Sequence, residues 1–534
     1  MKLIQTFWSL PSLAPTTEGQ VENRFGGGWA TERNHAMSWA LSCMKWKTFY
    51  PDLTLYTDRL GMDWLINRLQ LPYPNVRMEL DQLDHYNPML WAMPKLFVYS
   101  QQKEPFIHCD GDTFIWGRLS GDLERQPLIC QSIEHNYTYY KKILKEMYEG
   151  LPFIPEVLKV DLDEPIVSAN AGILGGNDIE FIQDLCAQAF EFIHRNEAEL
   201  PSITVGILNV VIEQFFFYRL ARQQNKTISI LLDNVEESFS SLLRFNTVPI
   251  LSKYVHAISF SKKSKHISQQ IEERLKYEHP RIYHHVDAQY RLPPVHLAVN
   301  GLREDDMPHT RTLAVRLKPE ITLAAHHDHL CDQVEELIAD NYDDQQYKLL
   351  LDIYQIEKFM YDTAPFLISD EFSWQDKHKT YNLLYNISPE DLLNRPFTLR
   401  SSHCRIAWIN HAIGIDNLDT EMEEISAGRK NPEPRDAPVG LMLYLHQHRV
   451  RCFFLLQWSA FLELFDGSSM TGNELIEWIR SEKNTSFHYK GPDIRRSVVE
   501  FLMTHMIDPA CLRPGDPTPQ PHAMPAMDSM ALDI

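Results

Sequence analysis

The sequence predicts an α/β fold for the N-terminal part of the chain, with a mixed or parallel sheet flanked by helices. Short β-rich runs alternate with helical patterns over the first hundred residues, which is the order of βαβ units. The apolar run 105–109 leads directly into acidic residues, as expected where a buried strand ends at the ligand edge of a sheet. With 44% hydrophobic and 11% aromatic residues, the chain has ample apolar material for buried cores.

The elements of this fold follow one another over the first 290 residues. Residues 3–9 form a short β-rich run, and a cluster of three glycines at 26–28 follows in a loop. We expect further helices and strands from apolar spacing and from β-branched or aromatic runs. The helices are expected over 29–49, 62–70, 87–102, 135–149, 178–196, 204–224 and 266–289, the strands over 53–58, 105–109, 166–176 and 228–232, and a strand end plus loop over 253–263.

A chain of 534 residues is long enough for several domains. Polar, proline-bearing and low-complexity stretches suggest where these domains meet. The expected division is an α/β domain over 1–300, a mostly helical domain over 301–425, a linker over 426–438, a small module over 439–512, and a disordered, proline- and methionine-rich tail over 513–534.

Composition excludes several function classes. The formal net charge of -21 argues against broad nucleic-acid binding, because phosphate-reading surfaces carry a basic excess. No uninterrupted apolar run of about 18 residues is present, and the first residues do not resemble a signal peptide, so we expect a cytoplasmic protein without a membrane span. The eight cysteines are scattered singly without a CxxC pair, which favours reduced thiols over a zinc or redox site.

The strongest chemical motif is Asp110-Gly111-Asp112, at the end of the apolar run 105–109. The glycine permits a tight turn, so both carboxylates can reach one cation. Mg²⁺ and Mn²⁺ prefer oxygen ligands and often complete their coordination with a substrate's diphosphate. Such a cation would neutralise charge on a departing nucleoside diphosphate, which indicates a group-transfer reaction.

Three motifs in order resemble those of GT-A-fold glycosyltransferases, including glycogenin-like enzymes. Asp110-Gly111-Asp112 is similar to their metal-binding D-x-D, and Asn170-Ala171-Gly172 is similar to the N-[AS]-G strand that lines their sugar pocket. His256 and Lys262 resemble the ends of the H-x-x-G-x-x-K segment, although Ser259 replaces its glycine. The resemblance covers about residues 1–290 and implies a GT-A-like, Rossmann-like sheet.

The resemblance also implies roles for these residues. Asp110, Asp112 and His256 would hold Mn²⁺ or Mg²⁺, and Lys262 or its neighbour Lys263 would contact the diphosphate of a nucleotide-sugar donor. Asn170 would act at the sugar, with the sugar pocket shaped by its neighbours. The residues expected to bind the donor are therefore Gly111, Ala171, Gly172, Lys262 and Lys263.

Other residues are nominated by their positions in such a domain. Strand-end residues would hold the nucleoside, and a basic residue before the D-x-D strand would face the diphosphate; these are Thr6, Phe7, Trp8, Tyr56, Thr57, Asp58 and Lys95. Core packing for Trp8, a helix cap for Asp58 and a solvated helix face for Lys95 are the competing interpretations. Asn177 and Asp178 could contact the sugar or cap a helix.

Glu213, followed by Gln214, lies on an otherwise apolar helix, where a charged group is costly unless it has a partner or faces a cleft. It is therefore a candidate catalytic base or sugar-orienting residue, with a paired core carboxylate as the alternative. The run His326-His327-Asp328-His329 is a rival metal signal, but adjacent side chains point in different directions and seldom converge on one ion.

The C-terminal module resembles the winged-helix modules that recognise leader peptides in peptide modification. Helices expected over 450–467, 471–480 and 494–508, with a turn at Asp466-Gly467, carry this resemblance. It implies an acceptor that could be a peptide or protein.

These observations together predict a metal-dependent glycosyltransferase that uses a nucleotide-diphosphate sugar. Two alternatives remain open at this point. One is a metal-dependent phosphohydrolase or nucleotidyltransferase that uses the same carboxylates, and the other is a non-catalytic binding or scaffold protein that kept the fold.

Overall fold

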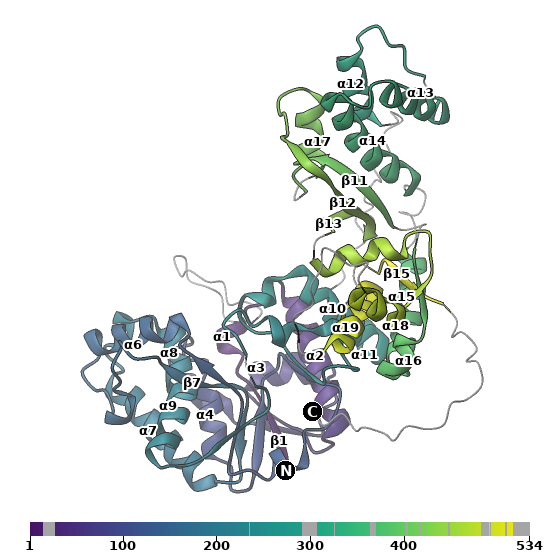
Figure 1. Ribbon diagram of the computed structural model, residues 1–534. Coiled ribbons are helices and arrows are strands. Elements are labelled where there is room, and N and C mark those ends of the chain that lie inside the picture. Colours follow the sequence, from purple (N-terminus) through teal and green to yellow (C-terminus); the bar gives the residue numbers. More distant parts are fainter. Residues whose placement is uncertain are drawn as a thin grey trace, which may run out of the picture. The chain divides into compact units, whose positions relative to one another are not determined.

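The structure is a computed structural model in which two compact units, Met1–Pro294 and Val295–Ile534, are described separately (Figure 1). No helix in the described part of the chain is both long and apolar enough to cross a membrane. The described residues are 1–13, 27–233, 235–290, 307–324, 326–363, 370–400, 404–415, 418–446, 449–455, 457–481, 491, 493–507 and 510–515.

The first unit is built on a seven-stranded mixed sheet of order β3-β2-β1-β4-β7-β6-β8. Strands β3, β2, β1 and β4 run parallel, and β7 runs antiparallel to both of its neighbours. The predicted α/β class with a mixed, helix-flanked sheet is therefore confirmed. The strands are β1 (Lys2–Phe7), β2 (Thr54–Thr57), β3 (Asn75–Met78), β4 (Phe106–Cys109), β6 (Leu128–His135), β7 (Val167–Gly176) and β8 (Ile228–Ile230).

Helices surround this sheet. Those of four or more residues are α1 (Leu10–Leu13), α2 (Glu32–Phe49), α4 (Met93–Ser100), α5 (Gly121–Glu124), α6 (Thr138–Gly150), α7 (Ile179–Arg195), α8 (Val205–Val210), α9 (Phe216–Gln223), α10 (Lys265–Glu278) and α11 (Pro280–Tyr290). The short helix α3 (Arg59–Gly61) and the π-helical segments η1 (Met62–Arg68) and η5 (Val211–Phe215) join them, as do the 3-10 segments η2 (Leu80–Leu83), η3 (Glu156–Leu158), η4 (Leu200–Ser202), η6 (Ser240–Leu243), η7 (Phe245–Thr247) and η8 (Ser259–Lys263).

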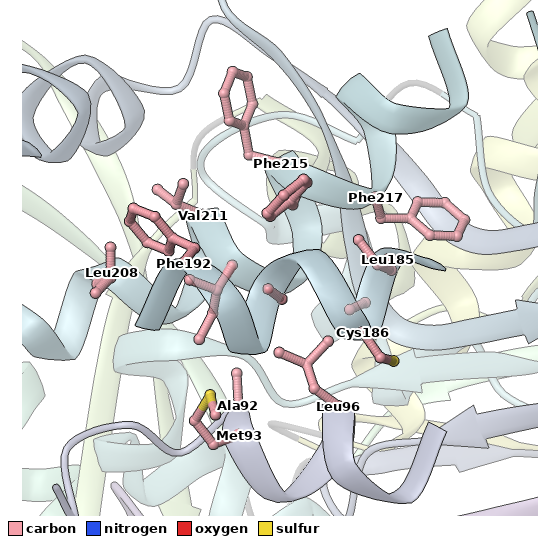
Figure 2. Packing of buried hydrophobic residues seen from close by; sticks show 14 of the residues in the cluster. Ala92, Met93, Leu96, Leu185, Cys186, Phe192, Leu208, Val211, Phe215 and Phe217 are labelled. Atoms are coloured by element: carbon pink, nitrogen blue, oxygen red, sulfur yellow. The ribbon is translucent and has the colours of Figure 1, made fainter. Parts of the chain in front are cut away.

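A large apolar core fixes the position of β4, β6 and β7. Helices α4, α6, α7, α8 and α9, with η5, contribute buried side chains that pack against residues of these strands. Figure 2 shows Cys186 of α7 next to Leu96 of α4, and Phe192 of α7 near Val211 of η5. Burial of each such side chain contributes about 1.5–3 kcal/mol to folding. The strand ends next to this core are therefore held rigidly.

Some predicted elements of the first unit have different bounds. The helix expected over 87–102 begins only at Met93, because Pro94 lacks a backbone N–H and suits the first turn of a helix. The helix expected over 204–224 is α8, η5 and α9 in succession, with a π-helical turn around Glu213. Strands β3 and β6 were not anticipated, since both carry polar residues that interrupt the apolar pattern.

The second unit contains two three-stranded antiparallel sheets, of orders β11-β12-β13 and β14-β10-β15. Their strands are β10 (Pro396–Leu399), β11 (Cys404–His411), β12 (Pro434–His446), β13 (Arg449–Phe454), β14 (Met470–Thr471) and β15 (Leu512–Pro514). The helices are α12 (Pro308–Leu317), α13 (His327–Asp340), α14 (Gln345–Thr363), α15 (Asp370–Leu384), α16 (Pro389–Leu393), α17 (Leu418–Ser426), η10 (Gln457–Phe465), α18 (Gly472–Arg480) and α19 (Ile494–Ile507).

Several predictions for this unit were wrong. Strand β12 begins at Pro434, inside the segment 426–438 that we expected to be a linker. The helix expected over 450–467 is strand β13 followed by η10, because the apolar run at its start pairs with β12. Periodicity alone does not distinguish a helix from a strand in such a short apolar run. Here hydrogen bonds to β12 make it a strand.

The winged-helix resemblance finds no support in this arrangement. Residues 439–446 belong to β12, and β12 pairs with β11. Because β11 precedes residue 439, the expected module 439–512 shares a sheet with residues outside it. The helices expected over 471–480 and 494–508 are present as α18 and α19. The expected disordered tail 513–534 begins inside β15, and from residue 516 onward it lies outside the described residues.

Candidate metal centre

The carboxylate pair lies where β4 ends. Strand β4 is buried along its length and sits between the parallel β1 and the antiparallel β7. The backbone N–H of Asp110 donates to the carbonyl of Gly172 on β7 (3.0 Å), and the carbonyl of Asp110 accepts from the hydroxyl of Thr113 (2.7 Å). The turn after the strand is thus fixed by hydrogen bonds on both sides.

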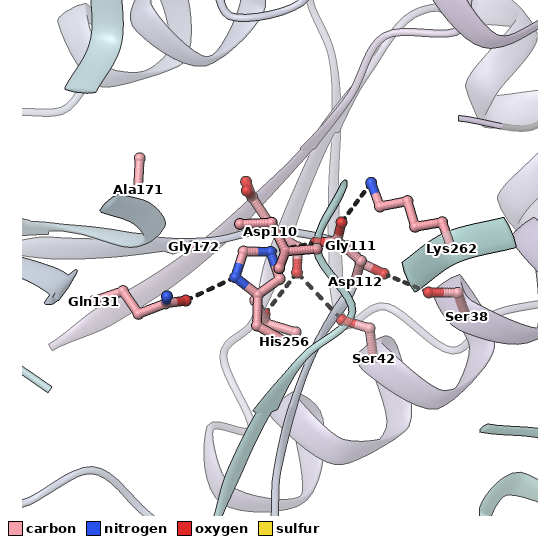
Figure 3. Close-up of polar contacts among 12 residues, drawn as sticks. Ser38, Ser42, Asp110, Gly111, Asp112, Gln131, Ala171, Gly172, His256 and Lys262 are labelled. Carbon is pink, nitrogen blue, oxygen red and sulfur yellow. Dashed lines mark hydrogen bonds and ion pairs between the residues drawn. The ribbon is translucent and has the colours of Figure 1, made fainter. Parts of the chain in front are cut away.

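Gly111 is required at this turn for a steric reason. A Cβ atom there would lie 2.4 Å from Cζ2 of Trp39, whose indole fills the space beside the turn. Ser38, also on α2, donates from its hydroxyl to the carbonyl of Gly111 (3.2 Å), as Figure 3 shows. Helix α2 therefore packs directly against the carboxylate turn.

A small two-stranded sheet brings His256 to the same place. Strand β5 (Thr113–Ile115) follows the turn and pairs antiparallel with β9 (Tyr254–His256), so that Thr113 stands opposite His256. The N–H of Ala257 donates to the carbonyl of Asp112 (2.9 Å). As a result, Nε2 of His256 lies 3.3 Å from Oδ1 of Asp112, although the two residues are far apart in the sequence.

Asp110, Asp112 and His256 form a candidate metal-binding group. One ligand atom from each of Asp110, Asp112 and His256 lies within 4.8 Å of the others. Oδ1 of Asp112 is buried, and its contact with Nε2 of His256 lacks hydrogen-bond geometry, so both atoms can face one cation. Two carboxylates and one imidazole suit Mn²⁺, and the carboxylates also suit Mg²⁺.

Two lysines contact the carboxylates. Nζ of Lys95, on α4, lies 2.6 Å from Oδ1 of Asp110, and Nζ of Lys262, on η8, lies 2.6 Å from Oδ2 of Asp112. Figure 3 shows Lys262 reaching Asp112 from the side opposite His256. Lys263 is exposed, so Lys262 is the lysine of this pair that the fold directs to the carboxylates.

The two carboxylates have opposite electrostatic environments. Burial raises the pKa of Asp110, and the nearby Asp112 adds to this rise, while Lys95 opposes it. Burial also acts to raise the pKa of Asp112, but Lys262 and His256 outweigh this effect and hold the pKa well below its ordinary value. Asp112 therefore stays ionised, as a metal ligand must.

Glu213 is joined to this centre through Lys95. It is fully buried on η5, where it accepts from the hydroxyl of Tyr99 (2.7 Å) and lies 3.3 Å from Nζ of Lys95. Burial raises the pKa of Glu213 to about 6, although Lys95 acts in the opposite direction. Lys95 is thus a bridge between two carboxylates and not a solvated surface residue.

The segment Asn170-Ala171-Gly172 lies on β7 beside the carboxylate turn. The side-chain amide of Asn170 donates to Glu134 (2.7 Å), and its carbonyl accepts from the N–H of Gly172 (3.0 Å). The N–H of Ala171 donates to the side chain of Gln214 (3.0 Å). Asn170 is thus held by protein partners at both ends of its amide.

Comparison with known proteins identifies a family for this chain. A model described as "Family of unknown function (DUF6734)" matches residues 1–289, which is the part that carries the metal centre. The chain belongs to the DUF6734 family. No curated protein matches it.

Part of this DUF6734 chain is similar to solved structures of a galactosyltransferase. A crystal structure of the galactosyltransferase LgtC in complex with donor and acceptor sugar analogs is 12% identical, with a TM-score of 0.23, and covers 40% of this chain and 70% of that chain. An active-site mutant of LgtC is 10% identical, with the same TM-score and coverage.

The nucleoside-site residues predicted for the DUF6734 chain are engaged in the core of the protein. The indole of Trp8 donates to Asp84 (3.3 Å), and the ring of Phe7 packs against Trp39 and Trp64. The hydroxyl of Thr6 is buried without a partner, on the strand next to β4. Their predicted contact with a nucleoside stays a prediction.

Helix caps account for two further nominated residues. Asp58 caps α3 by accepting from Gly61 and also accepts from the hydroxyl of Ser9 (2.6 Å). Asp178 caps α7 and pairs with Lys226. Asn177 donates to the carbonyl of Arg125 (2.7 Å).

The rival histidine run lies in the second unit of the DUF6734 chain. His326 is the N-cap residue of α13, and the ring of His327 stacks on Tyr361 with centroids 3.6 Å apart. Among the described residues, the metal-binding group at Asp110, Asp112 and His256 is the one that the geometry supports.

Sequence reasoning missed Gln131, Glu134 and Trp39. Gln131 accepts from His256, Glu134 holds Asn170, and Trp39 fills the space above Gly111. Gln131 and Glu134 lie on β6, a strand that the sequence analysis did not anticipate, and Trp39 has ordinary helical spacing on α2. No local pattern distinguishes these residues, because their roles arise only from tertiary contacts.

Proposed function

We propose that this chain is a metal-dependent glycosyltransferase that takes a nucleotide-diphosphate sugar as donor. The observation that supports it best is the convergence of Asp110, Asp112 and His256 at the end of β4, with Lys262 beside Asp112. Ligands of open α/β sheets bind at the carboxyl ends of the strands, which is where this group lies. The resemblance of the three motifs to GT-A enzymes adds the donor class.

In this proposal Asp110, Asp112 and His256 bind Mn²⁺ or Mg²⁺ together with the donor diphosphate. The bound cation would neutralise charge that develops on the departing nucleoside diphosphate. Lys262 would exchange its contact with Asp112 for a contact with a phosphate oxygen, since an ammonium group is a compact partner for phosphate. Lys95 would keep Asp110 ionised and oriented.

The sugar would lie beside β7. Gly172 lets β7 approach His256 closely, and hydrogen bonds within the protein fix Asn170 and Ala171 along the strand. Glu213 is the proposed base or sugar-orienting residue, because its raised pKa suits proton exchange near neutral pH. The nature of the acceptor, including the peptide suggested by the sequence, stays a prediction without support from the second unit.

The proposal is tested by donor binding to the full chain. UDP-, GDP- and dTDP-sugars are screened by thermal shift with and without Mn²⁺, and release of the nucleoside diphosphate is measured for any donor that binds. We expect one nucleotide class to stabilise the wild type only in the presence of Mn²⁺, by about 2.7 kcal/mol at a hundredfold excess over Kd. Asp112→Asn should abolish this metal-dependent stabilisation.

Lys262 and Lys263 provide a matched pair of variants. Lys262→Ala should weaken donor binding by about tenfold or more, since it removes a charged phosphate contact worth about 1.5–3 kcal/mol, whereas Lys263→Ala should bind as the wild type does. Absence of any metal-dependent nucleotide stabilisation of the wild type would overturn the proposal. Nucleotide cleavage at the phosphates without sugar transfer would favour the phosphohydrolase or nucleotidyltransferase alternative.

A further inference from the structure

Gln131 occupies a special position in the sheet. It lies on β6, where the register with β7 shifts between Cys130 and Ser132, so that Gln131 stands opposite the segment 171–173. Such irregularities redirect side chains relative to a regular ladder. Gln131 is fully buried, and its side chain extends over Gly172 toward His256, as Figure 3 shows.

Gly172 creates the space in which the amide of Gln131 meets the imidazole of His256. A Cβ atom at Gly172 would lie 2.1 Å from Oε1 of Gln131 and 2.6 Å from Nδ1 of His256. Any other residue would push these two groups apart. The glycine therefore serves the contact between two side chains, in addition to any role in shaping a sugar pocket.

The hydrogen bonds at this point define which nitrogen of His256 carries the proton. Oε1 of Gln131 lies 2.7 Å from Nδ1 of His256 and accepts a second hydrogen bond from the hydroxyl of Tyr254 (2.7 Å). An amide oxygen has no proton to donate, so this hydrogen bond requires a proton on Nδ1. Nε2 is then the ring nitrogen left for a metal, after release of any second proton that it shares with Asp112 at 3.3 Å.

We propose that Gln131 is a positioning residue that fixes the Nδ1–H tautomer and the ring orientation of His256, so that Nε2 is presented to a metal ion. This inference rests on the proposed function, because it requires that His256 is a metal ligand. Metal-bound histidines commonly donate their second ring N–H to such a partner, and removing the partner lowers metal affinity by about 10- to 100-fold. Here Oε1 of Gln131 is the partner that accepts this hydrogen bond from His256.

If the Gln131 amide had the opposite orientation, the other tautomer of His256 would be expected. With its NH₂ group toward His256, Nδ1 would accept and Nε2 would be protonated, which leaves no lone pair for a metal. The tautomer of His256 therefore distinguishes the two arrangements without any metal present.

The first experiment measures Mn²⁺ affinity in the full chain by electron paramagnetic resonance, with and without UDP. Gln131→Met removes the acceptor at similar size and should weaken Mn²⁺ binding by about 10- to 100-fold. Gln131→Glu retains an acceptor oxygen and should restore affinity to within a few-fold of wild type. Tyr254→Phe, the matched control, removes the other hydrogen bond to Oε1 and should also stay within a few-fold.

The second experiment reads the tautomer directly in metal-free protein labelled with ¹⁵N-histidine, with His256→Asn to assign the signal. We expect the Nδ1–H form in the wild type and its loss in Gln131→Met. An Nε2–H form in the wild type, or unchanged Mn²⁺ affinity in Gln131→Met, would overturn the inference. Failure of the wild type to bind Mn²⁺ with or without UDP would instead overturn the proposed metal site, while the tautomer result still reports on Gln131.

Discussion

At the scale of single residues, the centre depends on side chains that fit tightly around the D-x-D turn. Asp110 and Asp112 were predictable, because a carboxylate pair after an apolar run has chemical meaning in the sequence alone. Trp39 was not, since nothing in its own helix indicates that its indole rests on Gly111. The D-x-D motif can therefore be predicted from the sequence, whereas the side-chain packing that holds it in place cannot.

Gly111→Ala provides a test at this scale. The added methyl group would collide with the indole of Trp39, and overpacking of this kind costs about 1–3 kcal/mol. We expect a lower unfolding midpoint in urea and weaker Mn²⁺ binding. Gly121→Ala is the control, because its Cβ would only approach the end of the flexible Arg125 side chain at 3.3 Å. Equal stability and equal Mn²⁺ affinity in the two variants would contradict this steric account.

At the scale of elements, strands with a regular apolar pattern were predicted well and partly polar ones were missed. The expected strands 105–109 and 166–176 correspond to β4 and β7, which are buried along nearly their whole length. Strand β6 carries Gln131, Ser132 and Glu134, so its sequence lacks the apolar run that marks a central strand. Two of these polar residues, Gln131 and Glu134, hold His256 and Asn170 at the metal centre, which explains why the apolar pattern fails there.

Strand β11 shows how an element of the second unit is protected at its edge. The backbone of Trp408 exchanges two hydrogen bonds with the side chain of Gln355 on α14. Asp352, one turn earlier on α14, accepts from the N–H and side chain of Asn410 and from Nδ1 of His411. Side chains of a helix thus replace a missing neighbouring strand, which prevents this edge from pairing with other chains.

Asp352→Ala should therefore destabilise the second unit more than Gln355→Ala. Asp352 is fully buried, and its loss leaves a backbone N–H and a histidine without their acceptor, at about 1–3 kcal/mol for each unpaired group. Gln355 is only partly buried, so water can replace its contacts. Hydrogen exchange of the β11 amides measures the difference, and similar protection in both variants would contradict the role of Asp352.

At the scale of the whole molecule, each unit contains a buried histidine that resists protonation. Burial lowers the pKa of His35 in the first unit to about 3 and that of His505 in the second unit to about 4. The unfolded chain binds protons at these residues near pH 6.5, whereas the folded chain does not. Their stabilising contribution is thus present above pH 6.5 and is lost as the pH falls below it.

The expected size of this effect is about 1.4 kcal/mol for each histidine between pH 7.5 and pH 5.5. Buried carboxylates with raised pKa values, such as Glu134, act in the opposite direction, so the effect is measured by comparing variants. His505→Gln should reduce the pH dependence of urea unfolding of the second unit and leave that of the first unit unchanged. An unaltered pH dependence in both units would show that His505 is not buried as described.

Lys95 has one further consequence for the whole centre. A single ammonium group lies between Asp110 and Glu213, and it cannot neutralise both carboxylates fully. The two acids compete for one shared counter-ion, so whatever supplies positive charge to Asp110 releases Lys95 toward Glu213. The ionisation of Glu213 on η5 therefore depends on whether a cation occupies the site at Asp110. Residues far apart in the sequence make this link, which exists only in the folded chain.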